Sequence, residues 1–244
     1  MSRRPPASRP PFSERQPKNQ ILAALPADDF RRLLPHLTTV PVRARQLLHH
    51  SGEPLRFVYF PNGGIVSIAT VLSDGTTLAA AAIGDEGVIG GEAMLGDDAW
   101  SFADSQVRVP DTAERMSVDA FRRAVSEPGA LRDLIGRFLH VLIALSMQNA
   151  VCRVRHAARQ RCARWLLTMH DRMYAHEFLL SHEALADMLG MQRPTVSAVA
   201  SGLQRNGLIR YHYGRVTVLN PEGLQAETCE CYASVRALLD RLRQ

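Results

Sequence analysis

The character of the sequence changes at Ser117, and this change determines the expected fold class. Over residues 40–116, short β-prone runs alternate with turn signals such as Pro61-Asn62-Gly63-Gly64 and Ser73-Asp74-Gly75. Many short strands at regular spacing are typical of a sandwich or a rolled barrel. After Ser117 the apolar residues recur every three or four positions, as they do on helices. We therefore expect an α+β protein, with an N-terminal β-roll of jelly-roll type followed by helices.

The strands of the expected roll lie in short apolar runs, at residues 57–60, 64–71, 77–83, 87–89, 105–109 and 113–116. Upstream of them, residues 21–37 predict two short helices, of which the second begins near Pro26. Residues 1–19 are rich in Pro, Arg and Ser and offer little apolar surface to bury, so we expect a disordered tail there. Downstream, Ser117 opens a short helix that ends before Glu127-Pro128-Gly129.

A long helix is predicted after Gly129. Within it, seven residues recur at alternating steps of four and three, the a/d pattern of a coiled coil. These residues are Leu131, Ile135, Phe138, Leu142, Leu145, Asn149 and Cys152. We interpret them as the seam of a parallel homodimer, in which Asn149 is a polar position that fixes register and oligomeric state. The alternative is a helix that packs only on its own β-domain. Because Leu134 and Val141 widen the apolar face, packing on both is expected.

Residues 157–173 predict a further amphipathic helix, and residues 179–197 then carry the pattern of a helix-turn-helix. Ser181 can cap the first of its two helices, and Gly190 can supply the tight turn between them. Pro194 falls in the first turn of the second helix, where its missing N–H costs nothing. Val196, Val199 and Leu203 form the inward stripe of that second helix. A purely structural helical hairpin is the alternative interpretation.

The outward face of the second helix is rich in hydrogen-bonding groups and nearly free of acids. Arginine can bond guanine in two places, glutamine can read adenine, and hydroxyls can reach bases or phosphates. Residues 208–219 predict a hairpin whose tip, Tyr213-Gly214-Arg215, suits a phosphate-touching wing. The candidate DNA-binding residues are Ser181, Gln192, Arg193, Thr195, Ser197, Ser201, Arg205 and Arg215.

The positive charge of the chain is concentrated in the same region. The net charge is +5, but residues 153–215 alone carry +6, whereas residues 21–152 carry −4. A mildly acidic body followed by a strongly basic segment favours a polyanion-binding module in the C-terminal third. A solvated, arginine-rich helix face is the alternative.

Several function classes are excluded by missing residues. Lys18 is the only lysine, which excludes a P-loop and a catalytic lysine in the body of the chain. The sequence also lacks GxGxxG after a strand, a nucleophile elbow and HExxH, so we do not expect an enzyme. The N-terminus has no apolar signal segment, and the most apolar stretch, residues 138–145, is far shorter than the roughly 20 residues of a membrane span. We expect a cytoplasmic protein without a membrane partner.

The cysteines predict neither disulfides nor a metal centre. The four of them, Cys152, Cys162, Cys229 and Cys231, are too few and too scattered for a disulfide framework. Cys229-Glu230-Cys231 lacks the CxxC spacing of zinc sites and has no histidine downstream. We expect reduced, partly buried thiols and no bound metal.

From about residue 21 to 220 the sequence resembles the Crp/Fnr superfamily of bacterial regulators. The resemblance rests on VYFP at 58–61 with Gly64, IGDEGVIGGE at 83–92, LADMLG at 185–190 with RPTVS at 193–197, and LIRY at 208–211 through Val218. It implies a cyclic-nucleotide-binding-type β-roll, a long dimer helix and a C-terminal winged helix-turn-helix. It also implies a homodimer that binds a palindromic operator in double-stranded DNA, with RNA polymerase as a partner.

The departures from the family pattern concern the effector. Members that bind cyclic AMP carry a Gly-Glu pair and, about ten residues later, an Arg-Ser/Thr-Ala run whose arginine pairs with the phosphate. Gly91-Glu92 resemble the first part, but Ala103-Asp104-Ser105 stand at the second, so the arginine is missing and an acid lies beside its place. Cyclic AMP is therefore not expected. A pocket for another effector is placed at Gly90, Gly91, Glu92, Asp104 and Ser105.

Two further comparisons with the family bear on cofactors and on DNA sequence. Oxygen-sensing relatives bind an iron–sulfur cluster through N-terminal cysteines; here the first cysteine is Cys152, so no such cluster is expected. A haem on His49 or His50 stays open, although adjacent histidines near a strand are more often simply exposed. The family's Arg-Glu-Thr-x-x-Arg pattern matches at Arg193 and Thr195, but Pro194 and Ala198 replace the Glu and the second Arg. A half-site different from that of the catabolite activator is expected.

The predicted organisation has five parts: a disordered tail at 1–19, a sensor domain at 20–127, a dimerisation helix at 128–155, a winged helix-turn-helix domain at 156–220 and a C-terminal helix at 221–244. It predicts a sequence-specific transcription regulator under the control of an unidentified effector. The alternative is a ligand-sensing module that regulates a protein partner and carries a vestigial DNA-binding domain.

Overall fold

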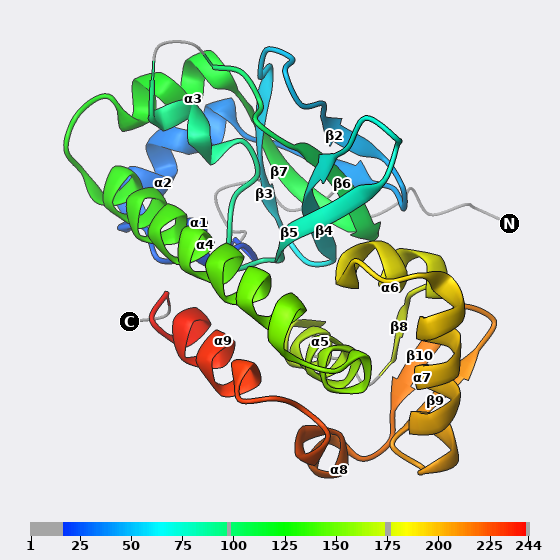
Figure 1. The fold of residues 1–244 in the computed structure, drawn as a ribbon. Coiled ribbons are helices and arrows are strands. Elements are labelled where there is room, and N and C mark those ends of the chain that lie inside the picture. Colours follow the sequence, from blue (N-terminus) through cyan, green and yellow to red (C-terminus); the bar gives the residue numbers. More distant parts are fainter. Residues whose placement is uncertain (1–16, 97–98, 174–176, 243–244) are drawn as a thin grey trace, which may run out of the picture.

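The structure, a computed structural model, describes residues 17–96, 99–173 and 177–242 (Figure 1). A β-rich domain and a helical C-terminal domain lie at opposite ends of one long helix, and the C-terminal helix runs beside that helix. The β-rich domain contains α1 (Gln20–Ala23), α2 (Ala27–Leu33), η2 (Leu34–His36), β1 (Thr38–Val42), β2 (Leu47–His49), β3 (Phe57–Pro61), β4 (Ile65–Val71), β5 (Thr77–Ile83), η3 (Gly91–Met94), β6 (Asp104–Val109), β7 (Asp111–Ser117) and α3 (Val118–Val125).

The strands form two antiparallel sheets, as expected for a β-roll. One sheet has the order β1-β7-β3 and the other the order β2-β6-β4-β5. Phe60 from β3, Val107 from β6 and Phe121 from α3 are fully buried between and beside these sheets. The long helix α4 (Ala130–Arg155) closes this core with Ile135 and Phe138.

Three details of the roll differ from the prediction. β1 and β2 were not expected, because β1 contains Pro41 and its burial does not alternate, while β2 has only three residues. The expected strand at 87–89 is a loop with a single bridge between Ile89 and Tyr59. A Cβ on Gly87 would lie 2.2 Å from Phe138 Cε2, so this segment approaches α4 more closely than a side chain allows.

The end of the predicted tail is ordered. Residues 1–16 lie outside the described residues, but Asn19 is fully buried. Its side-chain amide donates to the carbonyls of Pro61, Asp85 and Gly87, and its Oδ1 caps α1. Asn19 therefore anchors the start of the β-rich domain. An isolated polar residue in a Pro-rich stretch gave no indication of this role.

The predicted dimer seam on α4 faces the interior of the same chain. Leu131, Ile135, Phe138, Leu145 and Cys152 are each at most 5% exposed, and Leu142 packs at the edge of the core of the β-rich domain. Asn149, expected at a partner helix, donates instead to the Ala80 carbonyl at 2.9 Å and accepts from Arg164 at 2.9 Å. The assignment of these residues to a partner was wrong, because the β-roll, α5 and α9 already cover this face.

The C-terminal domain follows α4 directly. Its elements are α5 (Ala158–Met173), β8 (Glu177–Leu179), α6 (His182–Leu189), α7 (Arg193–Arg205), β9 (Ile209–His212), β10 (Arg215–Val218), α8 (Pro221–Ala226) and α9 (Cys231–Asp240). The single closing helix predicted at 221–244 is two helices. Leu224 of α8 fills the core of the C-terminal domain, whereas Val235 of α9 packs on Val141 and Leu145 of α4, so the chain bends between them.

The two domains contact each other through β5 and α6. The Arg108 guanidinium on β6, with a side chain only 6% exposed, lies 3.0 Å from the Asp187 carboxylate on α6. Arg172 on α5 pairs with the buried Glu86 of the β-rich domain at 3.0 Å. The structure thus records one defined arrangement of the β-rich domain against the helix-turn-helix.

Candidate nucleic-acid interface

The first helix of the helix-turn-helix begins and ends as the sequence predicts. The Ser181 side chain accepts a hydrogen bond from the Ala184 amide at 3.0 Å, which satisfies one of the free N–H groups of α6. Gly190 ends α6 in the left-handed region with φ 59°. A residue with a side chain is strained there, so the tight turn into α7 requires glycine.

The recognition helix α7 has a sharply divided surface. Pro194 lies in its first turn, and Val196, Ala200 and Leu203 are buried against α5 and α6. The opposite side is exposed to solvent. It carries Ala198 and five of the predicted DNA-binding residues, which are Gln192, Arg193, Thr195, Ser201 and Arg205. This division leaves α7 with an uncovered polar face of the kind that enters a major groove.

Ser197 differs from the other candidates, because its hydroxyl is already engaged. It is half-buried and lies 2.9 Å from His182 Nδ1 on α6. The His182 ring also stacks at 4.2 Å, centroid to centroid, on Tyr211 of β9. Burial, together with the nearby Arg193, lowers the pKa of His182, so the imidazole is neutral at pH 7. Ser197 and His182 therefore tie α7 to α6.

The hairpin of β9 and β10 forms the wing. Tyr213 and Gly214 both have positive φ, 45° and 73°, as a two-residue type I′ turn requires. Tyr213 is 92% exposed at the tip. The Arg215 guanidinium lies 3.0 Å from Glu177 on β8, on an exposed surface where such a pair is weak and a phosphate could replace the carboxylate.

One residue that positions the wing was missed by sequence reasoning. Gln204 on α7 accepts a hydrogen bond from the Tyr211 amide at 2.6 Å, which fixes the start of the wing to the recognition helix. Nothing in the local pattern indicated this contact, since exposed glutamine is common on helices.

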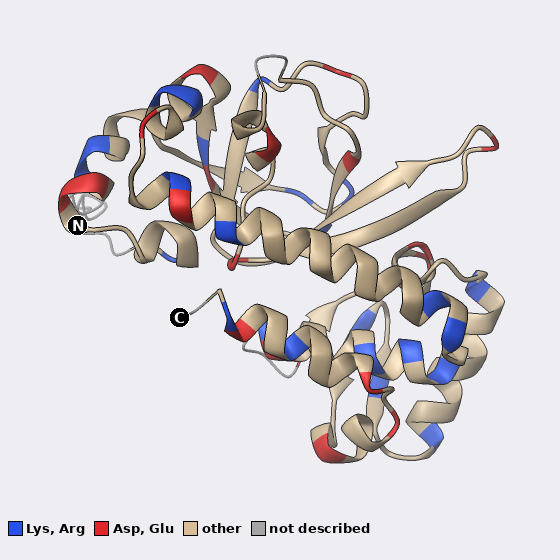
Figure 2. Cartoon of the chain, turned by 60° about the vertical axis from the view of Figure 1, so that its left-hand side comes forward, with Lys and Arg blue, Asp and Glu red and all other residues tan. Residues whose placement is uncertain are grey.

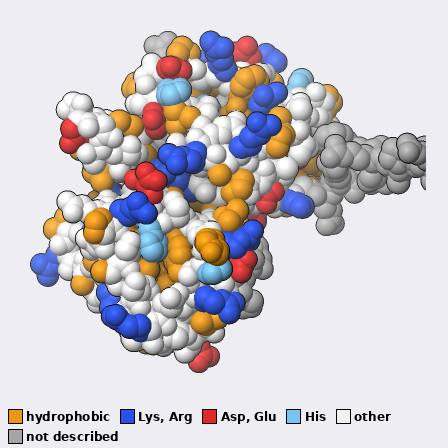
Figure 3. Space-filling model, turned by 90° about the vertical axis from the view of Figure 1, so that its right-hand side faces the viewer, with side chains coloured by type: hydrophobic (Ala, Val, Ile, Leu, Met, Phe, Trp, Pro, Cys, Tyr) orange, Lys and Arg blue, Asp and Glu red, His pale blue; other side chains and the backbone are white. Residues whose placement is uncertain are grey.

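Basic residues gather around this part of the molecule. Figure 2 shows arginines concentrated at the lower end of α4 and in the DNA-binding domain, whereas acidic residues are more frequent in the β-domain. Figure 3 views the side of the molecule that carries α6 and α7, and arginine and histidine side chains are spread over it among apolar ones. The charge asymmetry of the sequence is thus an asymmetry of the folded surface.

The residues of the proposed effector pocket lie around one region of the roll. Gly90 faces His49, from which a Cβ would lie 2.9 Å away, and His49 is paired with Ser105 across β2 and β6. Asp104 accepts a hydrogen bond from the Ser51 amide at 2.8 Å, and Gly91 and Glu92 open the short helix η3. Burial raises the pKa of Glu92.

His49 and His50 differ in their surroundings. His50 is exposed, whereas His49 is 7% exposed and its Nε2–H donates to the Phe57 carbonyl at 2.9 Å. The His49 ring is therefore already held by the strand beside it.

Comparisons with known proteins agree with this architecture. Residues 160–227 match the family of Crp-like helix-turn-helix domains. Transcriptional regulator SdrP of Thermus thermophilus is 28% identical over 201 residues, which cover 77% of this chain and 92% of SdrP. Transcriptional regulator LdrP of the same species is 26% identical over 196 residues, covering 75% of this chain and 93% of LdrP.

Solved structures share the fold at lower identity. FixK2 from Bradyrhizobium japonicum is 21% identical and has a TM-score of 0.68, over 79% of this chain and 98% of FixK2. The c-di-GMP responsive regulator CLP from Xanthomonas campestris is 20% identical with a TM-score of 0.65, over 79% of this chain and 99% of CLP. With its β-roll, its long helix and a Crp-like helix-turn-helix domain at residues 160–227, the chain has the fold of these solved regulators and is similar to DNA-binding transcriptional regulators of the Crp/Fnr family.

Proposed function

We propose that the protein is a cytoplasmic homodimer that binds a two-fold related DNA site through paired α7 helices and acts on transcription together with RNA polymerase. The homodimer is inferred from a second stripe of residues on α4, on the side away from the β-roll. Gly136, His140, Ile143, Met147, Ala150 and Val154 recur at steps of four and three, the a/d spacing of a coiled coil. Ile143, Met147 and Val154 are 62%, 67% and 85% exposed, which is unusual for apolar residues in one row.

A partner helix is the occupant that this stripe fits best. Among the described residues, α4 is also the one helix long and apolar enough, by length and composition, to cross a membrane, and 28% of its most apolar window is buried. Its opposite face is covered by the β-roll, α5 and α9, and arginines flank both of its ends. A parallel second copy of α4 would bury the exposed row by knobs-into-holes packing.

The dimer gives the recognition helices their geometry. Two α7 helices related by a two-fold axis would enter successive major grooves about 34 Å apart. Gln192, Arg193, Thr195, Ser201 and Arg205 would face the bases and the flanking phosphates, with Ser181 and Arg215 at the backbone. The hydroxyl of Ser197 supports the fit of α7 on α6, so its direct part in reading bases is smaller.

A regulatory role for the sensor domain follows from its contacts. The pairs Arg108–Asp187 and Arg172–Glu86 connect the roll to α6 and α5, so a ligand that moves β5 or β6 would change the position of the recognition helix. The region around Gly90, Gly91, Glu92, Asp104 and Ser105 is the proposed effector site. Because this region has no arginine that could pair with a cyclic phosphate, we assign it to an effector other than cyclic AMP. We assign no catalytic activity to the chain.

Ile143→Glu tests the dimer directly. Two buried carboxylates at one a/d layer would repel and lose their hydration, so we expect the variant to sediment as a monomer and to lose specific DNA binding. Leu219→Glu, which places the same charge at another exposed apolar position, 49% exposed, is the matched control and should stay dimeric. Sedimentation velocity decides the question. A dimeric Ile143→Glu protein would contradict the proposed seam.

A further inference from the structure

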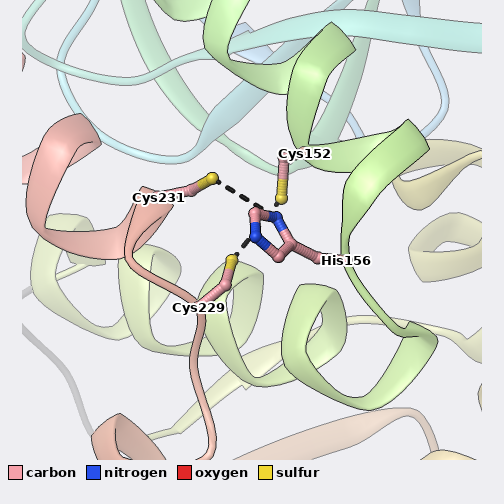
Figure 4. Close-up of side chains that lie close together, drawn as sticks. All are labelled: Cys152, His156, Cys229 and Cys231. Atoms are coloured by element: carbon pink, nitrogen blue, oxygen red, sulfur yellow. Dashed lines mark hydrogen bonds between the residues drawn. The ribbon is translucent and has the colours of Figure 1, made fainter.

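Four potential metal ligands meet at the junction of the two domains (Figure 4). Cys152 and His156 come from the end of α4, Cys229 from the turn between α8 and α9, and Cys231 from the start of α9. Their ligand atoms all lie within 4.8 Å of one another. The three cysteines are each at most 4% exposed, and the His156 side chain is 13% exposed.

Two of the distances between ligand atoms match those of a tetrahedral centre, and the others are at most 4.8 Å. Bonds of about 2.3 Å to sulfur and about 2.0–2.1 Å to nitrogen place neighbouring ligand atoms of a tetrahedron roughly 3.4–3.8 Å apart. Here Cys152 Sγ lies 3.6 Å from Cys229 Sγ, and Cys231 Sγ lies 3.5 Å from His156 Nδ1. An iron–sulfur cluster would need its cysteines farther apart, since a cluster and not one ion would lie between them.

The surrounding groups orient the ligands as they do in metal sites. His156 Nε2 lies 3.1 Å from the Glu230 carboxylate, which can only accept, so Nε2 carries the proton and the Nδ1 lone pair faces the cysteines. The side-chain amide of Gln148 donates to Cys231 Sγ at 3.0 Å. Such hydrogen bonds stabilise a metal-bound thiolate.

A thiol switch fits these observations less well. A reactive cysteine requires a lowered pKa and access to solvent. Burial raises the pKa of the Cys152 thiol to about 12, and the residue is 1% exposed.

We propose a structural Zn²⁺ site at the hinge between the sensor and DNA-binding domains, formed by Cys152, His156, Cys229 and Cys231. Three thiols and one imidazole complete a closed tetrahedral set of the Cys₃His kind, with no position left for water. On binding, the three thiols release their protons to solvent, and the one net negative charge that remains lies near Arg164. The ion would fasten the α8–α9 turn to the end of the proposed dimerisation helix.

The site escaped sequence reasoning because its ligands are far apart in the chain. A search for a histidine downstream of Cys229 overlooked His156, which precedes it by more than seventy residues. The available signal was local: Cys152 and His156 are four positions apart at the end of a helix, the spacing that places two side chains on one face.

The experiment is metal analysis of the full-length chain, expressed in zinc-supplemented medium and purified without an immobilised-metal step. We expect about one equivalent of zinc per chain by mass spectrometry of the elements, and a loss to below about one tenth in Cys229→Ser and His156→Ala. Cys162→Ala is the matched control, because Cys162 is also a fully buried thiol but lies on α5 outside the cluster; it should retain the metal.

Cobalt titration keeps the test independent of the folding of the variants. The metal-free wild-type chain should take up one Co²⁺ with the visible absorption of a tetrahedral thiolate complex, and one equivalent of Zn²⁺ should abolish that absorption. A wild-type chain that carries no zinc and gives no such spectrum with Co²⁺ would overturn the proposal. A Cys152–Cys229 disulfide in the chain purified under reducing conditions would overturn it as well.

Discussion

The polar residues of the recognition helix divide between two tasks. Arg193 and Thr195 project into solvent at its N-terminal end, which is the end that contacts base edges in helix-turn-helix proteins. Ser197, two positions after Thr195, forms a hydrogen bond with His182 and supports the packing of α7 on α6. Specificity is therefore expected to reside in the first turn of α7 more than in its middle.

Arg193→Ala tests this division. Because a bidentate contact from arginine to guanine discriminates one base pair from the others, we expect a loss of about 1–3 kcal/mol on the preferred site and a relaxed preference at one position of each half-site. Fluorescence anisotropy on a set of single-base variants of the site measures both. Arg215→Ala, at the wing, is the control and should weaken binding to all sequences alike. A uniform loss with Arg193→Ala would mean that this residue touches phosphate only.

His49 predicts a dependence of stability on pH. Burial lowers its pKa from the usual 6.5, so the folded state binds fewer protons than the unfolded state at mildly acidic pH. The contribution of neutral His49 to the free energy of unfolding is therefore fully present above pH 6.5. It is lost as the pH falls through the folded-state pKa. We expect the free energy of unfolding to decrease between pH 7.5 and 5.5, and to decrease less in His49→Gln. Urea unfolding at both pH values measures this; an unchanged slope in His49→Gln would contradict it.

Residues whose role is local were predictable. The Ser181 cap, the Gly190 turn and Pro194 in the first turn of α7 each follow from the backbone needs of a few neighbouring residues. Asn149 and Asn19 were misjudged because their partners, such as Ala80 and Asp85, are brought to them only by the folding of distant segments.

Among the elements, α4 is the one whose sequence pattern is compatible with two orientations of the helix against the β-roll. Apolar residues run at steps of four and three in two separate rows, one through Ile135 and Phe138 and the other through Ile143 and Met147. Periodicity alone cannot say which row faces the β-roll. The fold decides it, because Gly87 lets the loop after β5 approach Phe138 closely and thereby buries the first row.

The contact between β6 and α6 is the element-scale feature with the clearest energetic consequence. Arg108 also donates to Ser67 Oγ at 2.8 Å, so its nearly buried guanidinium depends on Asp187 for charge compensation. We expect Asp187→Ala to lower the free energy of unfolding by about 1–3 kcal/mol. A double-mutant cycle that combines this variant with Arg108→Met should give a coupling free energy between Arg108 and Asp187 above about 0.5 kcal/mol.

An exposed pair provides the comparison for that cycle. Arg31 and Asp28 form an i,i+3 ion pair on α2 with side chains 67% and 75% exposed. Removing Asp28 should change the free energy of unfolding by less than about 1 kcal/mol. Equal, small effects of Asp187→Ala and Asp28→Ala would show that the interdomain contact is absent in solution.

At the scale of the whole molecule, the sequence was informative about the order of parts and less so about their contacts. The change at Ser117 correctly separated a β-roll from the helices, and the basic segment coincides with the Crp-like domain at 160–227. The division of the last helix and the four-ligand cluster were not foreseen, because both depend on α9 folding back along α4 (Figure 1).

The whole-molecule account depends on two copies of α7 held in a fixed relation by paired α4 helices. The most direct measurement is the selection of bound sites from random double-stranded DNA by the full-length wild-type chain. The account predicts an enriched motif made of two inverted half-sites whose centres are one helical turn, about 34 Å, apart. An enriched motif without internal symmetry, or no enrichment over random DNA, would contradict it.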